Sequence, residues 1–195
     1  MKKIGVTGGI GSGKSYVTKV FEKLDISIFN ADIEAKKLMR NSNELKNLII
    51  THFGDDIYKN GLLNSKLLSS IVFSNKVKLQ KLNSLVHPMV KEEFKIWCIN
   101  QQSKYIIKEA AILFESNSHQ ELDAVICVSA PIEMRIRRIL NRDHLSENDI
   151  KKRIDNQISQ EEKEKLSNYI IVNDESNLLL PQIINLHEKL VSLSS

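Results

Sequence analysis

The sequence predicts an α/β fold, in which a parallel five-stranded sheet is flanked by helices and carries a helical insertion and a small helical lid. Short apolar runs alternate with longer stretches of helical spacing. A glycine-rich loop lies between the first apolar run and the first helical stretch. Two further segments break the alternation. Strands that alternate with helices form βαβ units, and such units build a parallel sheet.

Five strands are expected, and helical spacing follows several of them. The expected strands, in chain order, are 4–7, 26–29, 105–110, 124–129 and 169–172. Helices are expected from the spacing of apolar residues in 17–24, 31–40 and 180–191.

Two segments depart from this rhythm. Residues 41–102 contain helical stripes and no convincing strand, and residues 142–167 are highly polar with a thin stripe at Ile150, Ile154 and Ile158. A helix pair with so small an apolar face predicts a mobile lid. The expected organisation is a core of 1–40, 103–141 and 168–195, a helical substrate-binding insertion of 41–102 and a lid of 142–167.

Composition indicates a folded globular chain. It has 195 residues, of which 42% are hydrophobic and 27% charged, which allows one compact domain with a small inserted part. The formal net charge of +4 is compatible with an anionic small molecule and with a nucleic acid, so charge alone does not choose between them.

The two cysteines, Cys98 and Cys127, are expected to be buried free thiols, because their spacing fits neither a metal site nor a disulfide framework. The N-terminus runs directly into the glycine-rich loop, and no apolar stretch is long enough for a signal peptide or a membrane span. We therefore expect a cytoplasmic location.

The segment from Gly8 to Ser15 reads GGIGSGKS and matches the phosphate-loop pattern G-x-x-x-x-G-K-[ST]. Its glycines let the backbone wrap around a phosphate, and successive N–H groups form an anion nest at a helix N-terminus. Lys14 can reach the β and γ phosphates, and the Ser15 hydroxyl can bind Mg²⁺. A ligand-free glycine turn is the alternative, but the strand before the loop and the helix after it favour a nucleoside triphosphate.

Asp32 follows the second expected strand. A carboxylate at the carboxyl end of a parallel strand faces the ligand crevice and could accept the proton of an attacking hydroxyl. Asp32 could equally be the N-cap of a helix over 33–40. The sequence leaves both interpretations open.

Arg135, Arg138 and Arg142 share one helix face, opposite Ile132, Ile136, Ile139 and Leu140. Arginines beside a mobile segment suit a lid that closes on a transferring phosphate. The alternative is a solvated basic face. Arg153, inside the same segment, favours the lid.

Other classes of phosphate-loop protein fit less well. The chain has no Asn-Lys-x-Asp sequence of the kind that reads guanine. Glu109 is a weak candidate for the acidic residue that follows a strand in motor ATPases, because Lys108 interrupts the apolar run. An insertion that covers a substrate, together with a lid, favours a small-molecule kinase.

At this level of detail the chain resembles the dephospho-CoA kinases over nearly its whole length. The residues that carry the resemblance are Thr7 to Ser15, Ala31-Asp32, His87-Pro88, Ile112 to Glu115, and Arg142-Asp143 followed by Arg153 and Gln157.

The resemblance implies transfer of the ATP γ-phosphoryl group to the 3′-hydroxyl of dephospho-CoA, the last step of CoA biosynthesis, with ATP and Mg²⁺ as cofactors. It also implies a small-molecule partner, without nucleic acid or membrane, and leaves the oligomeric state open. The implied catalytic residues are Lys14, Asp32 and Arg142. The implied nucleotide-binding residues are Gly8, Gly9, Gly11, Ser12, Gly13, Lys14, Ser15, Tyr16 and Arg138. Asp32 and His87 are the implied substrate-binding residues, and Ser15 the metal ligand.

Four residues depart from the family pattern, namely Asn30, Tyr16, Ala111 and Asn168, which stand where the family has Asp, Thr, Pro and Asp. Asn30 leaves Asp32 as the single carboxylate of its pair. Tyr16 removes a small hydroxyl contact to the α-phosphate.

The roles of two further residues stay open. His87 is either on the substrate side or structural, because Pro88 restricts it and often marks a helix start or a kink. Glu115 either caps a helix or lines the substrate cleft.

Two other functions stay open beside the main one. The first is a kinase for another small molecule, such as a nucleoside monophosphate or a shikimate-like acceptor. The second is an ATP-binding regulatory module without kinase activity.

Overall fold

The computed structural model describes residues 1–143 and 146–193; residues 144 and 145 of the expected lid and 194 and 195 of the expected core lie outside the described residues. The strands are β1 Lys2–Thr7, β2 Ser27–Asn30, β3 Tyr58–Lys59, β4 Leu62–Leu63, β5 Tyr105–Glu109, β6 Ala124–Ser129 and β7 Tyr169–Val172. The α-helices are α1 Lys14–Lys23, α2 Ala31–Asn41, α3 Asn43–Phe53, α4 Ser65–Phe73, α5 Lys76–Ile99, α6 Ile132–Asp143, α7 Glu147–Asp155, α8 Gln160–Leu166 and α9 Leu179–Ser192. Short 3₁₀ turns occupy Asp55–Ile57 and Ser118–Glu121.

The expected parallel five-stranded sheet is confirmed, with strand order β2-β5-β1-β6-β7. Strands β6 and β7 have the predicted bounds, and the other three differ by one or two residues at an end. Because all five strands are parallel, their carboxyl ends meet at one edge of the sheet. The register pairs Val6 and Asn30 with Glu109, and Ser129 with Val172, near that edge.

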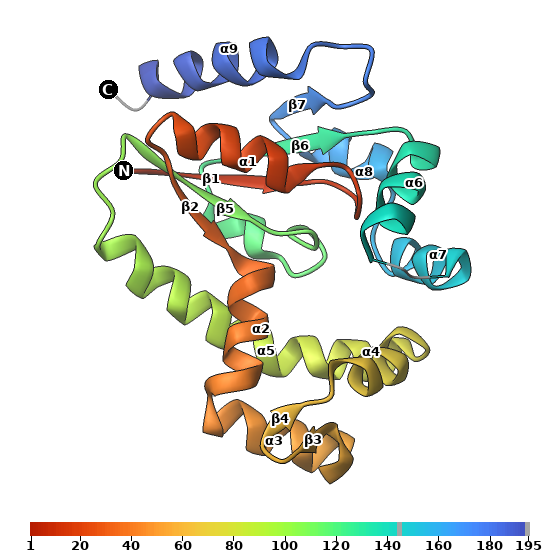
Figure 1. Ribbon diagram of the computed structural model, residues 1–195. Helices are drawn as coiled ribbons and strands as arrows, with labels where there is room; N and C mark the ends of the chain where they lie inside the picture. Colours follow the sequence, from red (N-terminus) through yellow and green to blue (C-terminus); the bar gives the residue numbers. More distant parts are fainter. Residues whose placement is uncertain (144–145, 194–195) are drawn as a thin grey trace. The chain divides into compact units, whose positions relative to one another are not determined.

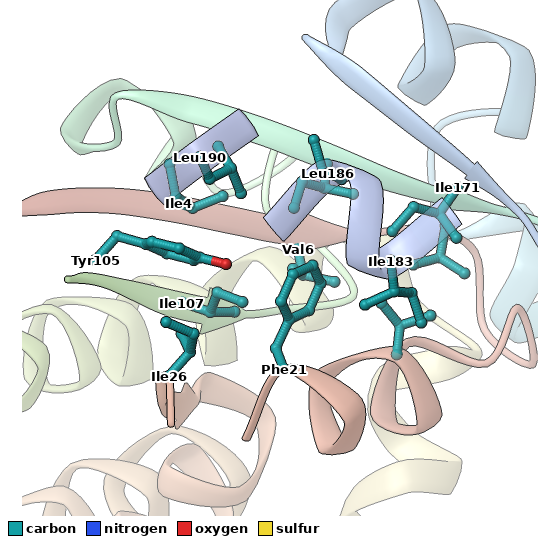
Figure 2. Packing of buried hydrophobic residues seen from close by; sticks show 13 residues of the cluster. Ile4, Val6, Phe21, Ile26, Tyr105, Ile107, Ile171, Ile183, Leu186 and Leu190 are labelled. Atoms are coloured by element: carbon teal, nitrogen blue, oxygen red, sulfur yellow. The ribbon is translucent and has the colours of Figure 1, made fainter. Parts of the chain in front are cut away.

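Helices α1 and α9 pack against each other on one face of this sheet (Figure 1). Figure 2 shows the side chains of Ile4, Val6, Tyr105 and Ile107 meeting Phe21 of α1 and the apolar residues of α9. The strand residues alternate, so that i and i+2 share this face. Burial of Phe21 is complete, and replacing a buried Phe with Ala costs about 3–5 kcal/mol. This cluster fixes β1 and α1, the strand and the helix that flank the glycine-rich loop.

The other face of the sheet is covered in part by α8, which packs on β6, and by the segment that follows β5. Gly5 on β1 leaves room there, because a Cβ at that position would come within 2.7 Å of Leu113 and 2.8 Å of Leu122. Cys127 points to this face and is a buried free thiol, as expected, whereas Cys98 is only half-buried. Burial raises the pKa of Cys127 to about 11, so its thiol stays protonated at neutral pH.

The chain divides into two compact units, residues 1–30 with 97–195, and residues 31–96. The expected boundaries were 40/41 and 102/103. The second unit begins earlier because α2 packs against α3 and β4. Within α2, Ala31 alone is buried. The segment 142–167 falls within the first unit, so its separate role as a lid stays a prediction.

The second unit contains the β3–β4 hairpin, where the sequence analysis expected no strand. Asn60 and Gly61 form its turn, with φ angles of 51° and 79°. An Asn-Gly pair between apolar residues is the usual signal for a two-residue hairpin. The expectation of no strand in this segment is therefore wrong, although the Asn-Gly signal is present in the sequence.

Among the described residues, no helix is both long enough and apolar enough to cross a bilayer.

Candidate active site

The glycine-rich loop connects β1 to α1 at the carboxyl edge of the sheet, as the sequence predicts. Gly13 precedes α1 with φ 95° and ψ 21°, a left-handed conformation that favours glycine. A Cβ at this position would also overlap the Asn173 side chain. In the described ranges, the backbone amides of Gly11 and Gly13 donate to no protein acceptor. The Ser12 hydroxyl is buried and has no hydrogen-bond partner among the residues that the structure describes. Unsatisfied donors gathered in one loop suit an anionic ligand.

Lys14 lies in the first turn of α1 and is buried. Its Nζ donates to the carbonyls of Gly8 at 3.0 Å and Gly9 at 3.3 Å. Both acceptors are neutral, and an ammonium bonds more strongly to a phosphate oxygen than to a neutral carbonyl. Tyr16 is 63% exposed on the same helix, so its ring takes no part in the core.

Glu109, at the carboxyl end of β5, adds a carboxylate to the loop. Its Oε1 accepts a hydrogen bond from Ser15 Oγ at 2.7 Å, and its Oε2 accepts one from Thr18 Oγ1 at 2.8 Å. Sequence reasoning passed over Glu109 because Lys108 interrupts the apolar run. In the structure the buried Lys108 Nζ lies 3.3 Å from Glu121 Oε1, so its charge is paired and the strand accommodates it.

The three arginines of α6 have three different surroundings. Arg135 is buried, donates from Nε to the Ile10 carbonyl at 3.0 Å, and lies so close to Gly9 that a Cβ there would overlap its guanidinium. Burial lowers the pKa of Arg135. The expected division of α6 into an arginine face and an apolar face is therefore wrong at Arg135, which packs inward beneath the loop, whereas Ile132 and Leu140 are exposed.

Arg138 reaches the loop through Asn173, the first residue after β7. Its Nη2 donates to the Asn173 carbonyl at 3.3 Å and to Asn173 Oδ1 at 3.4 Å, while Asn173 Nδ2 donates to the Ser12 carbonyl at 2.8 Å. The same Nη2 lies 3.1 Å from Glu175 Oε1. Arg138 Nη1 is buried and has no hydrogen-bond partner within the described part of the chain. A charged donor with no partner beside the loop is suited to bind a phosphate.

Arg142 lies at the end of α6 with a side chain that is 65% exposed. It donates from Nε and Nη2 to the two carboxylate oxygens of Asp143, at 2.6 and 2.7 Å. These hydrogen bonds raise the pKa of Arg142, so it is a permanent cation.

Asp32 and His87 belong to the second unit. Helix α2 begins at Ala31, so Asp32 lies inside the first turn and is not the N-cap of a helix starting at residue 33, as one interpretation had it. A carboxylate in a first turn is favoured by the helix dipole. His87 is half-buried within α5, and Pro88 lies inside that helix rather than at its start.

A second set of residues holds the loop through contacts that the sequence did not predict. Gln157 and Gln160 accept hydrogen bonds from the Ile10 and Gly9 amides, and the turn that carries them is tied to Glu115 and Lys163. Glu115 was left open between a helix cap and a cleft residue. Its hydrogen bonds instead go to the Ile158 amide and to Lys163. The four residues lie 100 or more positions from the loop, and although Glu115 and Gln157 belong to the family resemblance, nothing in the local sequence indicates their contact with the loop.

Known proteins resemble this chain in sequence and in fold. A family model described as dephospho-CoA kinase matches residues 2–178. A dephospho-CoA kinase of Bacteroides fragilis is 37% identical over 185 residues, which cover 94% of this chain and 90% of that protein. Among solved structures, TT1252 from Thermus thermophilus superimposes with a TM-score of 0.83 at 27% identity, covering 100% of this chain and 98% of that one. A dephospho-CoA kinase from Campylobacter jejuni superimposes with a TM-score of 0.67 at 27% identity, covering 99% and 98%. The chain therefore belongs to the dephospho-CoA kinase family of phosphotransferases.

Proposed function

We propose that this chain transfers the γ-phosphoryl group of ATP to the 3′-hydroxyl of dephospho-CoA, giving CoA and ADP. The observation that carries the proposal is the phosphate loop between β1 and α1, with Glu109 and Arg138 beside it, in a chain of this family. Phosphoryl transfer needs little covalent participation from the protein, so positioning and charge stabilisation do most of the work.

The loop from Gly8 to Ser15 is the proposed triphosphate site. The unsatisfied amides of Gly11 and Gly13 support this assignment, as does the buried Lys14 ammonium. Lys14 would leave its carbonyl acceptors for the β and γ phosphate oxygens, where the opposite charge makes stronger hydrogen bonds. Tyr16, whose backbone amide donates to the Gly13 carbonyl at 3.0 Å, is proposed to lie near the α-phosphate.

Ser15 and Glu109 are the proposed residues for Mg²⁺. A hard cation prefers oxygen ligands, and both residues offer them. In the described ranges no group of three or more His, Cys, Asp or Glu could hold a metal, so the remaining ligands would be phosphate oxygens and water. When bound, Mg²⁺ neutralises charge on the β and γ phosphates.

Arg138 and Arg142 are the proposed cations for the transferring group. Arg138 supplies a buried donor that has no partner among the described residues, and Arg142 is the first residue of the segment 142–167 that is expected to close as a lid. An arginine stabilises the charge spread over the phosphoryl oxygens, and closure over the site excludes water that would otherwise hydrolyse ATP.

At the acceptor end, Asp32 is the proposed general base for the ribose 3′-hydroxyl, and His87 is a proposed substrate-binding residue. Asp32 is the second residue of α2, and the strand before it, β2, pairs with β5 so that Asn30 lies opposite Glu109. A carboxylate near an attacking hydroxyl contributes a factor of about 10²–10⁴ to the rate. The cytoplasmic location stays a prediction.

An acceptor panel with coupled detection of ADP tests the proposal. The panel contains dephospho-CoA, nucleoside monophosphates and shikimate, each with ATP and Mg²⁺. Of these acceptors, we expect that only dephospho-CoA is turned over. Mass spectrometry can check that the product has gained one phosphate group. Turnover with another acceptor while dephospho-CoA is inert would assign a different kinase activity, and ATP binding without ADP release would assign a regulatory module.

A further inference from the structure

The turn that follows α7, residues 156–160, ends at the first residue of α8, Gln160. It places two side-chain oxygens against the phosphate loop. Gln157 Oε1 accepts a hydrogen bond from the Ile10 amide at 3.0 Å, and Gln160 Oε1 accepts one from the Gly9 amide at 3.2 Å. The Ile10 carbonyl is held in turn by Arg135 Nε at 3.0 Å. The N–H group and the carbonyl group of Ile10 are therefore both bound by side chains that lie more than 120 positions away in the sequence.

This turn is anchored by a buried ion pair. Lys163 on α8 is fully buried, and its Nζ lies 2.7 Å from Glu115 Oε1. The same carboxylate oxygen accepts the Ile158 amide at 3.0 Å, and Lys163 Nζ also donates to the Ala111 carbonyl at 2.8 Å. A charge removed from water in this way is stable only with its partner in place. The pair therefore fixes the backbone of the turn one residue after Gln157.

The Gln160 amide has a defined orientation as well. Its Nε2 donates to Glu164 Oε1 at 3.0 Å and to Cys127 Sγ at 3.2 Å, and Glu164 Oε1 accepts Ser129 Oγ at 2.6 Å. Since Nε2 is committed to these acceptors, Oε1 is directed at the loop. The glutamine is thus held by β6 and α8 before it contacts Gly9.

We propose that Glu115 and Lys163 are positioning residues for nucleotide binding. Their buried ion pair fixes the 156–160 turn. Gln157 and Gln160 in this turn then hold the Ile10 and Gly9 amides, respectively, and set the conformation of the phosphate loop before the nucleotide binds. The inference rests on the proposed nucleotide site. A loop that is already ordered loses less conformational freedom on binding, so its affinity for phosphate is higher.

An arrangement in which the glutamines compete with the nucleotide predicts the opposite change in nucleotide affinity. If the glutamine oxygens competed with phosphate oxygens for the same amides, removing them would tighten nucleotide binding. In the arrangement we propose, removing them weakens it, because the Gly11 and Gly13 amides remain for phosphate but the loop that carries them is less ordered.

The test is calorimetric titration of the full chain with ADP and Mg²⁺, comparing the wild type with Gln157→Met. Methionine keeps the length of the side chain and removes the acceptor oxygen. Loss of one such hydrogen bond predicts about 3- to 10-fold weaker ADP binding. The matched control is Gln182→Met, because Gln182 Oε1 also accepts a backbone amide, that of Val172 at 2.8 Å. The control is expected to lower the melting temperature and keep the wild-type ADP affinity.

Glu115→Gln tests the ion pair, and the double variant with Gln157→Met tests whether the two residues act together. If the pair acts through the turn, Glu115→Gln also weakens ADP binding, and the double variant loses less than the product of the two single losses. ADP affinity in Gln157→Met that equals or exceeds that of the wild type would overturn the proposal, and strictly multiplicative losses would remove Glu115 from it. A wild type that does not bind ADP would instead overturn the nucleotide site itself.

Discussion

Glu109 Oε1 accepts a hydrogen bond from the Ser15 hydroxyl at 2.7 Å, which links the end of β5 to the start of α1. Because its second oxygen, Oε2, accepts a hydrogen bond from Thr18 Oγ1, both carboxylate oxygens face the first turns of α1. A carboxylate in contact with a residue proposed to bind Mg²⁺ orients that residue and raises the affinity of the site.

Glu109→Gln therefore tests the metal site. Ser15 and Thr18 donate to different carboxylate oxygens of Glu109, and glutamine replaces one of these oxygens with an NH₂ donor and removes the negative charge. We expect kcat/KM to fall about 10- to 100-fold, with a shift of the activity profile toward higher Mg²⁺ concentration. Glu22→Gln, an exposed change on α1, is the control. An unchanged Mg²⁺ profile would remove Glu109 from the site.

Asp32→Asn tests the general base. The amide cannot accept a proton at neutral pH, so kcat should drop roughly 10²- to 10⁴-fold, while calorimetric ADP affinity stays close to that of the wild type. Glu34→Gln is the matched control, because Glu34 lies in the same first turn of α2 and pairs with Lys37 at 3.0 Å. Near-normal kcat in Asp32→Asn would exclude it as the base.

Arg138→Ala and Arg137→Ala form a matched pair, since both arginines bind the Glu175 carboxylate. Arg138 alone of the two has a buried Nη1 with no partner in the described ranges and a contact to Asn173. Loss of a charged hydrogen bond to phosphate predicts about a 10- to 100-fold higher KM for ATP in Arg138→Ala. Arg137→Ala should stay within about twofold, because exposed ion pairs contribute little. Equal effects of the two changes would contradict a phosphate contact by Arg138.

Arg142→Ala tests the lid cation. We expect kcat to fall roughly 10²-fold, with the melting temperature unchanged, because this side chain is 65% exposed. Asp143→Ala is the comparison, since it removes the carboxylate partner and leaves the guanidinium in place. A variant of Arg142 that melts earlier but turns over normally would make the residue structural.

His187 on α9 predicts a pH dependence of stability. Its Nδ1 lies 2.8 Å from the Tyr105 hydroxyl, and its pKa is lowered first by burial and then by the charge of Lys104, against a smaller opposing effect of Glu188. The unfolded chain therefore takes up the His187 proton at higher pH than the folded chain does. The free energy of unfolding should fall as the pH drops from above about 6.5 through the lowered pKa.

Urea unfolding at pH 8 and pH 5.5 measures this effect. His187→Asn removes the titrating ring while keeping an acceptor near Tyr105, so its stability should fall less over this range than that of the wild type. The other histidines are present in both proteins, so the difference between the two proteins isolates the effect of His187. Equal losses in the two proteins would contradict the lowered pKa.

Local pattern was sufficient for much of the fold. The strands at 124–129 and 169–172 were predicted with their observed bounds, because an apolar run bounded by polar residues needs no distant partner to be recognised. The Asn60-Gly61 hairpin carried an equally local signal and was overlooked. The glycine-rich loop is likewise local, since glycine, lysine and serine at fixed spacing meet requirements of backbone conformation and charge within eight residues.

Contacts between distant residues could not be predicted in this way. Lys108 makes the β5 run look broken, and only its approach to Glu121 explains how the strand ends in the Glu109 carboxylate beside Ser15. Arg135 has the spacing of a surface arginine, yet its acceptor is the carbonyl of Ile10, 125 positions earlier.

The sequence by itself determined the five strands of the parallel sheet, the phosphate loop and the family resemblance, because each depends on neighbours along the chain. The tertiary structure decided which polar groups meet: Glu109 with Ser15, Asn173 with Ser12, and Gln157 with Ile10. A hydrogen bond requires two groups at about 3 Å in a defined orientation. Residues 94 to 161 positions apart reach that geometry only once the parallel sheet has brought the carboxyl ends of its strands to one edge.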